Sequence, residues 1–184
     1  MKTKILTTFF AFLCLFGSIK AQRTMQGQNM AGVSINHNFP DIGFSLAYGG
    51  YTMTGLWAIQ ASTDLYSQYL SAEKNKRLQY CHIAVSGYYM TSFFRTRSRN
   101  FNLYGGGGAL LGYEIIDPLK RTPKEVEVSL EDGYFIYGVF AKIETELFIS
   151  RRTAFTITAE TPINFSSPLD RIHYKAGIGI RIML

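Results

Sequence analysis

The sequence is poor in cysteine, in proline and in long apolar runs. Its 184 residues include 2 cysteines and 5 prolines. Two cysteines exclude a disulfide-stapled scaffold and a zinc site with four cysteine ligands. The only long uncharged apolar run, residues 5–16, is too short for a membrane-spanning helix, which needs about 20 residues.

Helical periodicity is also absent, whereas aromatic residues are plentiful. Aromatic side chains make up 15% of the chain and charged side chains 17%. This composition excludes an intrinsically disordered chain, which would have few aromatics and many charges. Seventeen glycines, together with many Tyr, Phe and Thr residues, favour β structure.

The first 21 residues have the three-part layout of a secretory signal peptide. Lys2 and Lys4 precede the apolar run, and Ala21 offers a small residue at a cut before Gln22. The alternative, a retained membrane anchor, is disfavoured because the run is short. We therefore expect a signal peptide over residues 1–21 and a single domain over residues 22–184.

Removal of this leader changes the charge of the chain. The formal net charge falls from +6 to +3, since the leader holds three lysines and no acid. The case for a basic nucleic-acid-binding protein weakens accordingly. Cys81 becomes the only cysteine, which predicts a small hydrophobic side chain without an internal disulfide.

Apolar and polar residues alternate through the domain with a period of two. In residues 171–184 one face is wholly apolar, and the other carries Arg171, Lys175 and Arg181. Such alternation indicates a strand, because successive side chains point to opposite faces of a sheet. Similar patterns predict eight strands, near residues 31–38, 41–51, 56–70, 77–94, 100–116, 133–149, 153–161 and 170–184.

The connections alternate in length. Those at Thr54, 95–100 and 150–152 are short, whereas 71–76, 117–132 and 162–169 are longer; 39–40 is a short exception. Short turns at one end and longer loops at the other are typical of outer-membrane barrels. We expect an all-β fold: a small antiparallel up-and-down barrel of about eight strands, of outer-membrane type. Tyrosines and Trp57 near strand ends would form interface girdles, with these members: Tyr48, Tyr51, Tyr66, Tyr69, Tyr89, Tyr113, Tyr134 and Tyr137.

Alternation alone does not say which face looks outward. A soluble lipocalin-like barrel would expose its charges, whereas a membrane barrel would enclose them. Strand length, loop pattern and leader favour the membrane barrel. The charges would then pair across a filled lumen without a pore: Lys142, Glu144, Glu146, Glu160, Lys175 and Arg181. The chain lacks the C-terminal aromatic residue that many such barrels carry.

The sequence shows little sign of catalysis or metal binding. No His-x-x-x-His or Cys-x-x-Cys pair exists, and His37, His82 and His173 lie on different predicted strands. His82 and Ser86 share a face, with Glu144, Glu146 and Glu160 as possible neighbours, but no orienting third group can be placed. We expect no enzyme activity, no catalytic or metal-binding residues and no cofactor.

Two further motifs have structural explanations. Residues 105–108 are four glycines but lack the Lys-Ser/Thr and the helix of a phosphate loop, so a close backbone approach within a strand is expected. Arg95, Arg97 and Arg99 form a basic turn without an element that fits a nucleic-acid groove.

Several segments resemble the TraO family of conjugative-transposon transfer proteins found in Bacteroidetes. They are the leader ending Ala21-Gln22-Arg23, residues 112–114 (Gly-Tyr-Glu), residues 132–138 (Asp-Gly-Tyr-Phe-Ile-Tyr-Gly), and residues 176–181 (Ala-Gly-Ile-Gly-Ile-Arg). The resemblance covers nearly the whole mature chain. It implies an exported, non-enzymatic outer-membrane component of a type IV secretion-like apparatus that supports DNA transfer by conjugation.

The expected partners are other conjugal transfer proteins of the cell envelope and the outer-membrane lipid, without direct nucleic-acid binding. Contacts would run through the basic turns and the charged residues 117–132. The alternatives are a general outer-membrane barrel of adhesin or envelope-stability type and a barrel enzyme that modifies lipid.

Overall fold

A computed structural model describes residues 27–38, 41–69, 77–96, 100–116, 133–167 and 171–184. The predicted leader and its cut before Gln22 lie outside these residues, as do Arg97, Arg99 and the charged segment 117–132. No helix in the described residues is long and apolar enough to cross a membrane.

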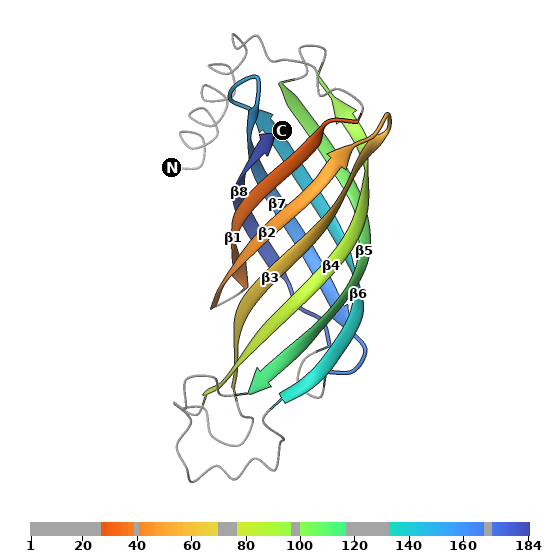
Figure 1. Cartoon of the computed structure of the whole chain (residues 1–184). Helices are drawn as coiled ribbons and strands as arrows, with labels where there is room; N and C mark the ends of the chain where they lie inside the picture. Colours follow the sequence, from red (N-terminus) through yellow and green to blue (C-terminus); the bar gives the residue numbers. More distant parts are fainter. Residues whose placement is uncertain (1–26, 39–40, 70–76, 97–99, 117–132, 168–170) are drawn as a thin grey trace, which may run out of the picture.

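Eight antiparallel strands form one closed barrel, in which each strand pairs with its neighbours in sequence and β1 pairs with β8 (Figure 1). The predicted fold class is confirmed. The strands are β1 (Asn29–Asn38), β2 (Asp41–Tyr51), β3 (Gly55–Tyr69), β4 (Arg77–Arg95), β5 (Phe101–Ile116), β6 (Gly133–Phe148), β7 (Thr153–Asn164) and β8 (Lys175–Met183).

The last two strands differ from the prediction. β7 runs to Asn164, and β8 begins at Lys175 instead of near residue 170. The chain before β8 still follows β7: the His173 N–H donates to the Pro162 carbonyl at 3.1 Å, and Ile172 forms an isolated bridge with Ile163. The alternation therefore extends beyond the continuous ladder.

Every strand is long enough to cross a membrane. The shortest, β8, has 9 residues and the longest, β4, has 19. A tilted strand needs about 9–11 residues for this, whereas the usual strand has about 5–6. The end of β8 lies with the short turns at the upper end of Figure 1; we call this the short-turn end and the opposite one the long-loop end.

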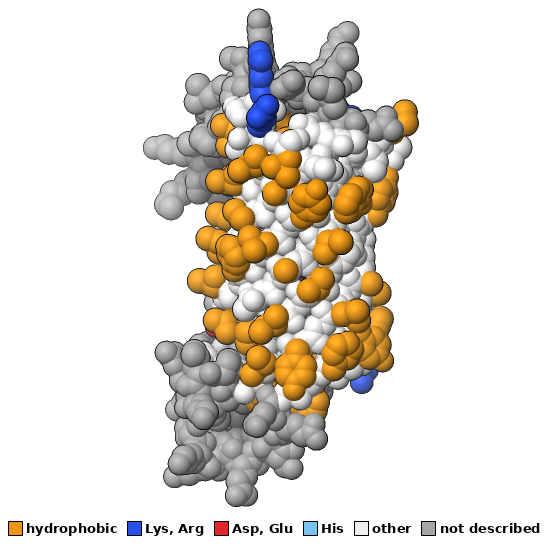
Figure 2. Space-filling view, viewed as in Figure 1, with side chains coloured by type: hydrophobic (Ala, Val, Ile, Leu, Met, Phe, Trp, Pro, Cys, Tyr) orange, Lys and Arg blue, Asp and Glu red, His pale blue; other side chains and the backbone are white. Residues whose placement is uncertain are grey.

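Apolar side chains face outward and polar ones inward. On β6, Val139 and Ile143 are exposed while Lys142 and Glu144 are buried. Figure 2 shows apolar side chains over the wall of the barrel and blue Lys and Arg side chains near its ends. The arrangement is the reverse of a soluble barrel and confirms the predicted orientation.

Two of the tyrosines assigned to the outer girdles are inside. Tyr51 and Tyr66 are each only 4% exposed. Tyr66 has the inward parity of Asp64 on β3, and Tyr51 pairs with the fully buried Leu56. Proximity to a strand end therefore misplaced them, since the side-chain face follows parity. The exposed aromatics do include Tyr48, Trp57, Tyr89, Tyr113 and Tyr137.

Large side chains fill the barrel from the short-turn end to its middle. They form one buried apolar cluster that includes Leu56, Tyr88, Met90, Phe140 and Met183. The Tyr88 and Phe140 rings pack edge to face, with centroids 5.9 Å apart. A narrow eight-stranded barrel is occupied by its own side chains in this way.

The four consecutive glycines allow close strand contact, as expected. A Cβ on Gly106 would lie 2.1 Å from the Tyr89 carbonyl oxygen, and one on Gly108 would lie 2.0 Å from that of Gly87. Both glycines are within β5, paired with β4. They serve sheet geometry, and a phosphate-loop role has no structural basis.

Candidate functional site: a charged interior behind an apolar wall

The interior near the short-turn end holds a charge cluster around Arg181, which we call the Arg181 cluster. The Arg181 guanidinium lies 2.6 Å from a Glu144 oxygen and 3.0 Å from a Glu146 oxygen. Tyr104 and Asn102 donate to Glu146 at 3.1 and 3.2 Å, and Tyr51 also donates to it. A nearly inaccessible carboxylate thus accepts hydrogen bonds from four donors, as burial of a charge requires.

Two lysines extend the ion pairing along the interior. Lys175 lies 2.6 Å from Asp64 and 3.9 Å from Glu160. Lys142 donates to the Gln60 side chain at 2.9 Å and lies 3.7 Å from Glu160. All six charged residues predicted to pair across the lumen therefore take part in ion pairs.

The interior near the long-loop end holds aromatic rings and histidines, which we call the histidine cluster. His82 Nε2 lies 2.7 Å from Glu114 Oε2, and the Ser167 hydroxyl donates to the same oxygen at 3.0 Å. The Tyr66 ring lies 4.7 Å from His82 and 4.4 Å from His173, between centroids. His82 and His173, assigned to separate strands from the sequence, meet here with their ring centroids 5.1 Å apart.

The partner of His82 differs from the expected ones. Glu144, Glu146 and Glu160 bind Arg181 and the lysines, whereas Glu114 lies directly opposite His82 in the β4–β5 register. Alternation places both side chains inside, but it gives no register. The sequence could have predicted the His82–Glu114 pair only if the glycine-rich β5 had been aligned residue by residue with β4.

The Ser86 and His82 side chains are not hydrogen-bonded to each other. Ser86 donates to the Gln60 main-chain carbonyl at 3.4 Å, while His82 is engaged with Glu114. A serine nucleophile needs a base within hydrogen-bond reach. Chemically, the arrangement provides a histidine–carboxylate pair enclosed by tyrosines.

In the part of the chain that the structure describes, no group of three or more His, Cys, Asp or Glu side chains is arranged so that it could hold a metal ion. His37 is exposed on β1, whereas His82 and His173 are buried. Cys81 is buried and unoxidised, consistent with a small hydrophobic side chain.

An apolar exterior, strands of membrane-crossing length and a filled, ion-paired interior define the class: a small barrel of the outer-membrane type. Solved structures agree on the fold. The chain is similar to the N-terminal β-barrel domain of Pseudomonas aeruginosa OprF, with 8% identity, a TM-score of 0.55 and coverage of 86% of this chain and 98% of that one. It is likewise similar to Neisserial surface protein A, with 11% identity, a TM-score of 0.55 and coverage of 85% and 95%.

Within that class, the chain belongs to the TraO family of conjugative transposon proteins, whose family model matches residues 19–184. The resemblance found in the sequence is thereby confirmed. A comparison with curated protein sequences gave no match.

Proposed function

We propose that this protein is a non-enzymatic outer-membrane component of a conjugative transposon's transfer apparatus, exported through a signal peptide over residues 1–21. The observation that carries the proposal is the match of residues 19–184, which include the whole barrel, to a conjugative transposon family. The match supports a transfer role for the barrel itself.

The outward apolar face supports the location. An antiparallel sheet crosses lipid only as a closed barrel, because an open edge would leave backbone groups without hydrogen bonds. This barrel is closed and exposes residues such as Ile59, Val85, Leu111 and Ile178. In water such a continuous apolar surface would drive aggregation, whereas in lipid it is satisfied.

The filled interior supports a role as an anchor instead of a conduit. The interior is occupied by Leu56 and Met90 near the short-turn end and by Phe140 near the middle, and Lys142 is paired with Glu160. A DNA strand has no path through such packing. The protein therefore acts through contacts with other envelope transfer proteins and with lipid, and not by binding DNA directly.

Mating frequency from a donor with an in-frame deletion of the gene tests the transfer role. A large drop that a plasmid copy restores is the expected result. The control is a plasmid copy lacking residues 1–21, which should not restore transfer because the product stays inside the cell. An unchanged frequency in the deletion strain would refute the proposal.

Trp57 provides a test of membrane insertion. It is the only tryptophan, and its side chain is 41% exposed on the outer face of β3. In vesicles of purified, refolded protein, we expect blue-shifted emission that brominated acyl chains quench. Emission at the wavelength of the urea-unfolded chain, with no quenching by bromolipid, would contradict insertion.

A further inference from the structure

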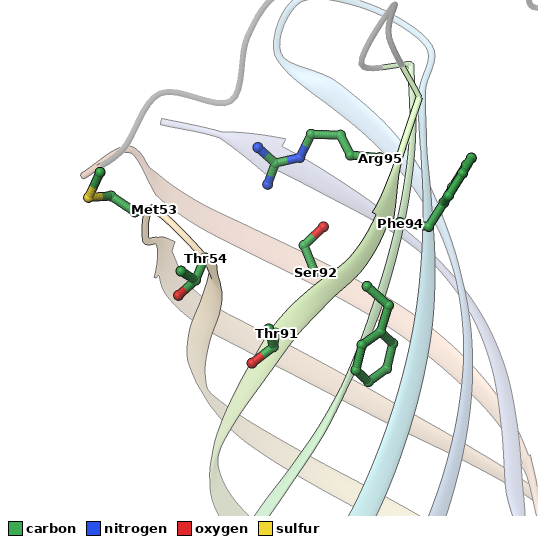
Figure 3. A pocket seen from close by; sticks show the side chains of 7 residues that line it. Met53, Thr54, Thr91, Ser92, Phe94 and Arg95 are labelled. Carbon is green, nitrogen blue, oxygen red and sulfur yellow. The ribbon is translucent and has the colours of Figure 1, made fainter.

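A notch opens in the wall at the short-turn end. The last β3–β4 pair is Gly55 with Thr91, yet β4 continues to Arg95 beside β5. The turn at residues 52–54 therefore stops below the rim and leaves a hollow of about 370 Å³. It is lined by Met53, Thr54, Thr91, Ser92, Phe93, Phe94 and Arg95 (Figure 3).

One side of the notch is an unpaired strand edge. The Ser92 N–H donates to the Thr54 carbonyl at 2.8 Å, and the Thr96 N–H donates to the Phe101 carbonyl of β5 at 3.0 Å. Successive residues of an antiparallel strand direct their main-chain groups to opposite edges. The N–H and C=O of Arg95 therefore face away from β5, toward an edge where the described residues place no strand.

The Arg95 side chain is the second group in the notch with unused hydrogen-bonding capacity. It is half-buried, and its Nε atom is buried without a hydrogen-bond partner in the described structure. Lys142, Lys175 and Arg181, by contrast, each contact a carboxylate. Figure 3 shows the guanidinium extending from β4 toward the turn that carries Met53, whereas Phe94 points away. A fork of donors in this position suits a carboxylate.

We infer that the notch binds an extended, carboxylate-bearing segment of another envelope protein, which adds to the free edge of β4 as a further strand. The identity of that protein as a transfer component rests on the proposed function. Strand addition onto an exposed edge is an established mode of peptide recognition. The segment's backbone would pair with Arg95, and its carboxylate would meet the guanidinium.

The chemistry of the edge favours a polypeptide over a lipid headgroup. Arg95 presents both an unpaired donor and an unpaired acceptor, and a polypeptide backbone supplies both, whereas a phosphate group only accepts. Charge points the same way, because Arg151 and Arg152 are exposed in the β6–β7 turn at the same end of the barrel (Figure 1). The described exposed residues at this end include no Asp or Glu, so a basic rim faces its partner.

Site-specific photo-crosslinking in donor cells tests the inference. Benzoylphenylalanine at Met53, which is 74% exposed in the notch, should give an adduct with one envelope protein, mapped to a segment containing Asp or Glu. Arg95→Gln should lower the adduct yield about tenfold or more, the effect of losing a charge-assisted hydrogen bond. Arg171→Gln, an exposed arginine outside the notch, is the matched control and should leave the yield unchanged.

Arg95→Pro separates strand addition from a side-chain contact alone. It removes the edge-facing N–H together with the charge, and proline is tolerated where that N–H does not serve the sheet. We expect a greater loss of adduct than with Arg95→Gln. Equal losses, with both variants folded by heat-modifiable gel mobility, would overturn strand addition.

Three outcomes would overturn the docking site itself. They are an adduct with lipid or lipopolysaccharide only, an adduct with nucleic acid only, and no adduct from folded protein. The mating test is independent of this readout. A deletion that leaves mating unchanged while the adduct forms refutes the transfer role alone. A deletion that abolishes mating, without a Met53 adduct, refutes the notch alone.

Discussion

Buried polar groups are stabilised in different ways at the two ends of the interior. In the Arg181 cluster, one guanidinium contacts Glu144 and Glu146, and three neutral donors complete the shell of Glu146. In the histidine cluster, His82 and Ser167 both contact one oxygen of Glu114, and the tilted Tyr66 ring packs beside His82.

The difference shows where stability is concentrated. The permanently charged Arg181 guanidinium stabilises the two carboxylates of the short-turn half. Its loss would leave both of them buried without a cation. The long-loop half depends on rings that still pack when one polar contact is lost. The Arg181 cluster should therefore be the sensitive half and the histidine cluster the tolerant one.

Arg181→Met should have the largest effect on folding. Removing one partner of a buried ion pair usually costs about 3–5 kcal/mol because the other charge stays buried. We expect at least that loss in the free energy of unfolding, measured by urea titration of protein refolded in detergent micelles. Arg181→Lys, which keeps the charge, should lose less. An unchanged urea midpoint for Arg181→Met would contradict the greater sensitivity of the Arg181 cluster.

Lys175→Met should have the second largest effect, about 2–3 kcal/mol. Asp64 would lose its ion pair but keep the Asn38 amide, which donates to it at 3.1 Å. Lys175 is also slightly more accessible than Arg181, so water can reach part of the site. The same urea titration measures this loss of stability. A loss exceeding that of Arg181→Met would show that the Arg181 cluster is not the more sensitive half.

Much of this interior follows from the sequence, and the rest does not, for a physical reason. Alternation in residues 137–147 and 171–184 placed Lys142, Glu144 and Arg181 on one face, and the connections predicted a closed barrel. A period of two fixes the face of a side chain but not its depth or its neighbour. The His82–Glu114 pair depends on register, and the inward Tyr51 and Tyr66 were misjudged because position along a strand was taken as a guide to its face.

Glu114→Gln tests the expected tolerance of the histidine cluster. The amide keeps an acceptor for Ser167 or His82 but loses the charge, so we expect a loss of about 1–2 kcal/mol. Ring contacts among Tyr66, His82 and His173 remain. Unfolding in urea at neutral pH is the measurement, and Glu146→Gln is the matched change in the Arg181 cluster. A greater loss for Glu114→Gln than for Glu146→Gln would reverse the ranking of the two halves.

Tyr88→Phe should have the smallest effect, because it removes only a hydroxyl from the middle of the barrel. The Tyr88 hydroxyl is buried without a hydrogen-bond partner in the described structure, while its ring packs on Phe140 and lies 4.4 Å below the Lys142 ammonium. Phenylalanine keeps both ring contacts and removes an unsatisfied group, so the free energy of unfolding should stay within about 0.5 kcal/mol. Tyr88→Ala, the control, should cost about 3–5 kcal/mol by leaving a cavity. A loss from Tyr88→Phe as large as that from Glu114→Gln would show that the hydroxyl belongs to the polar network around Lys142 and is not an unsatisfied group.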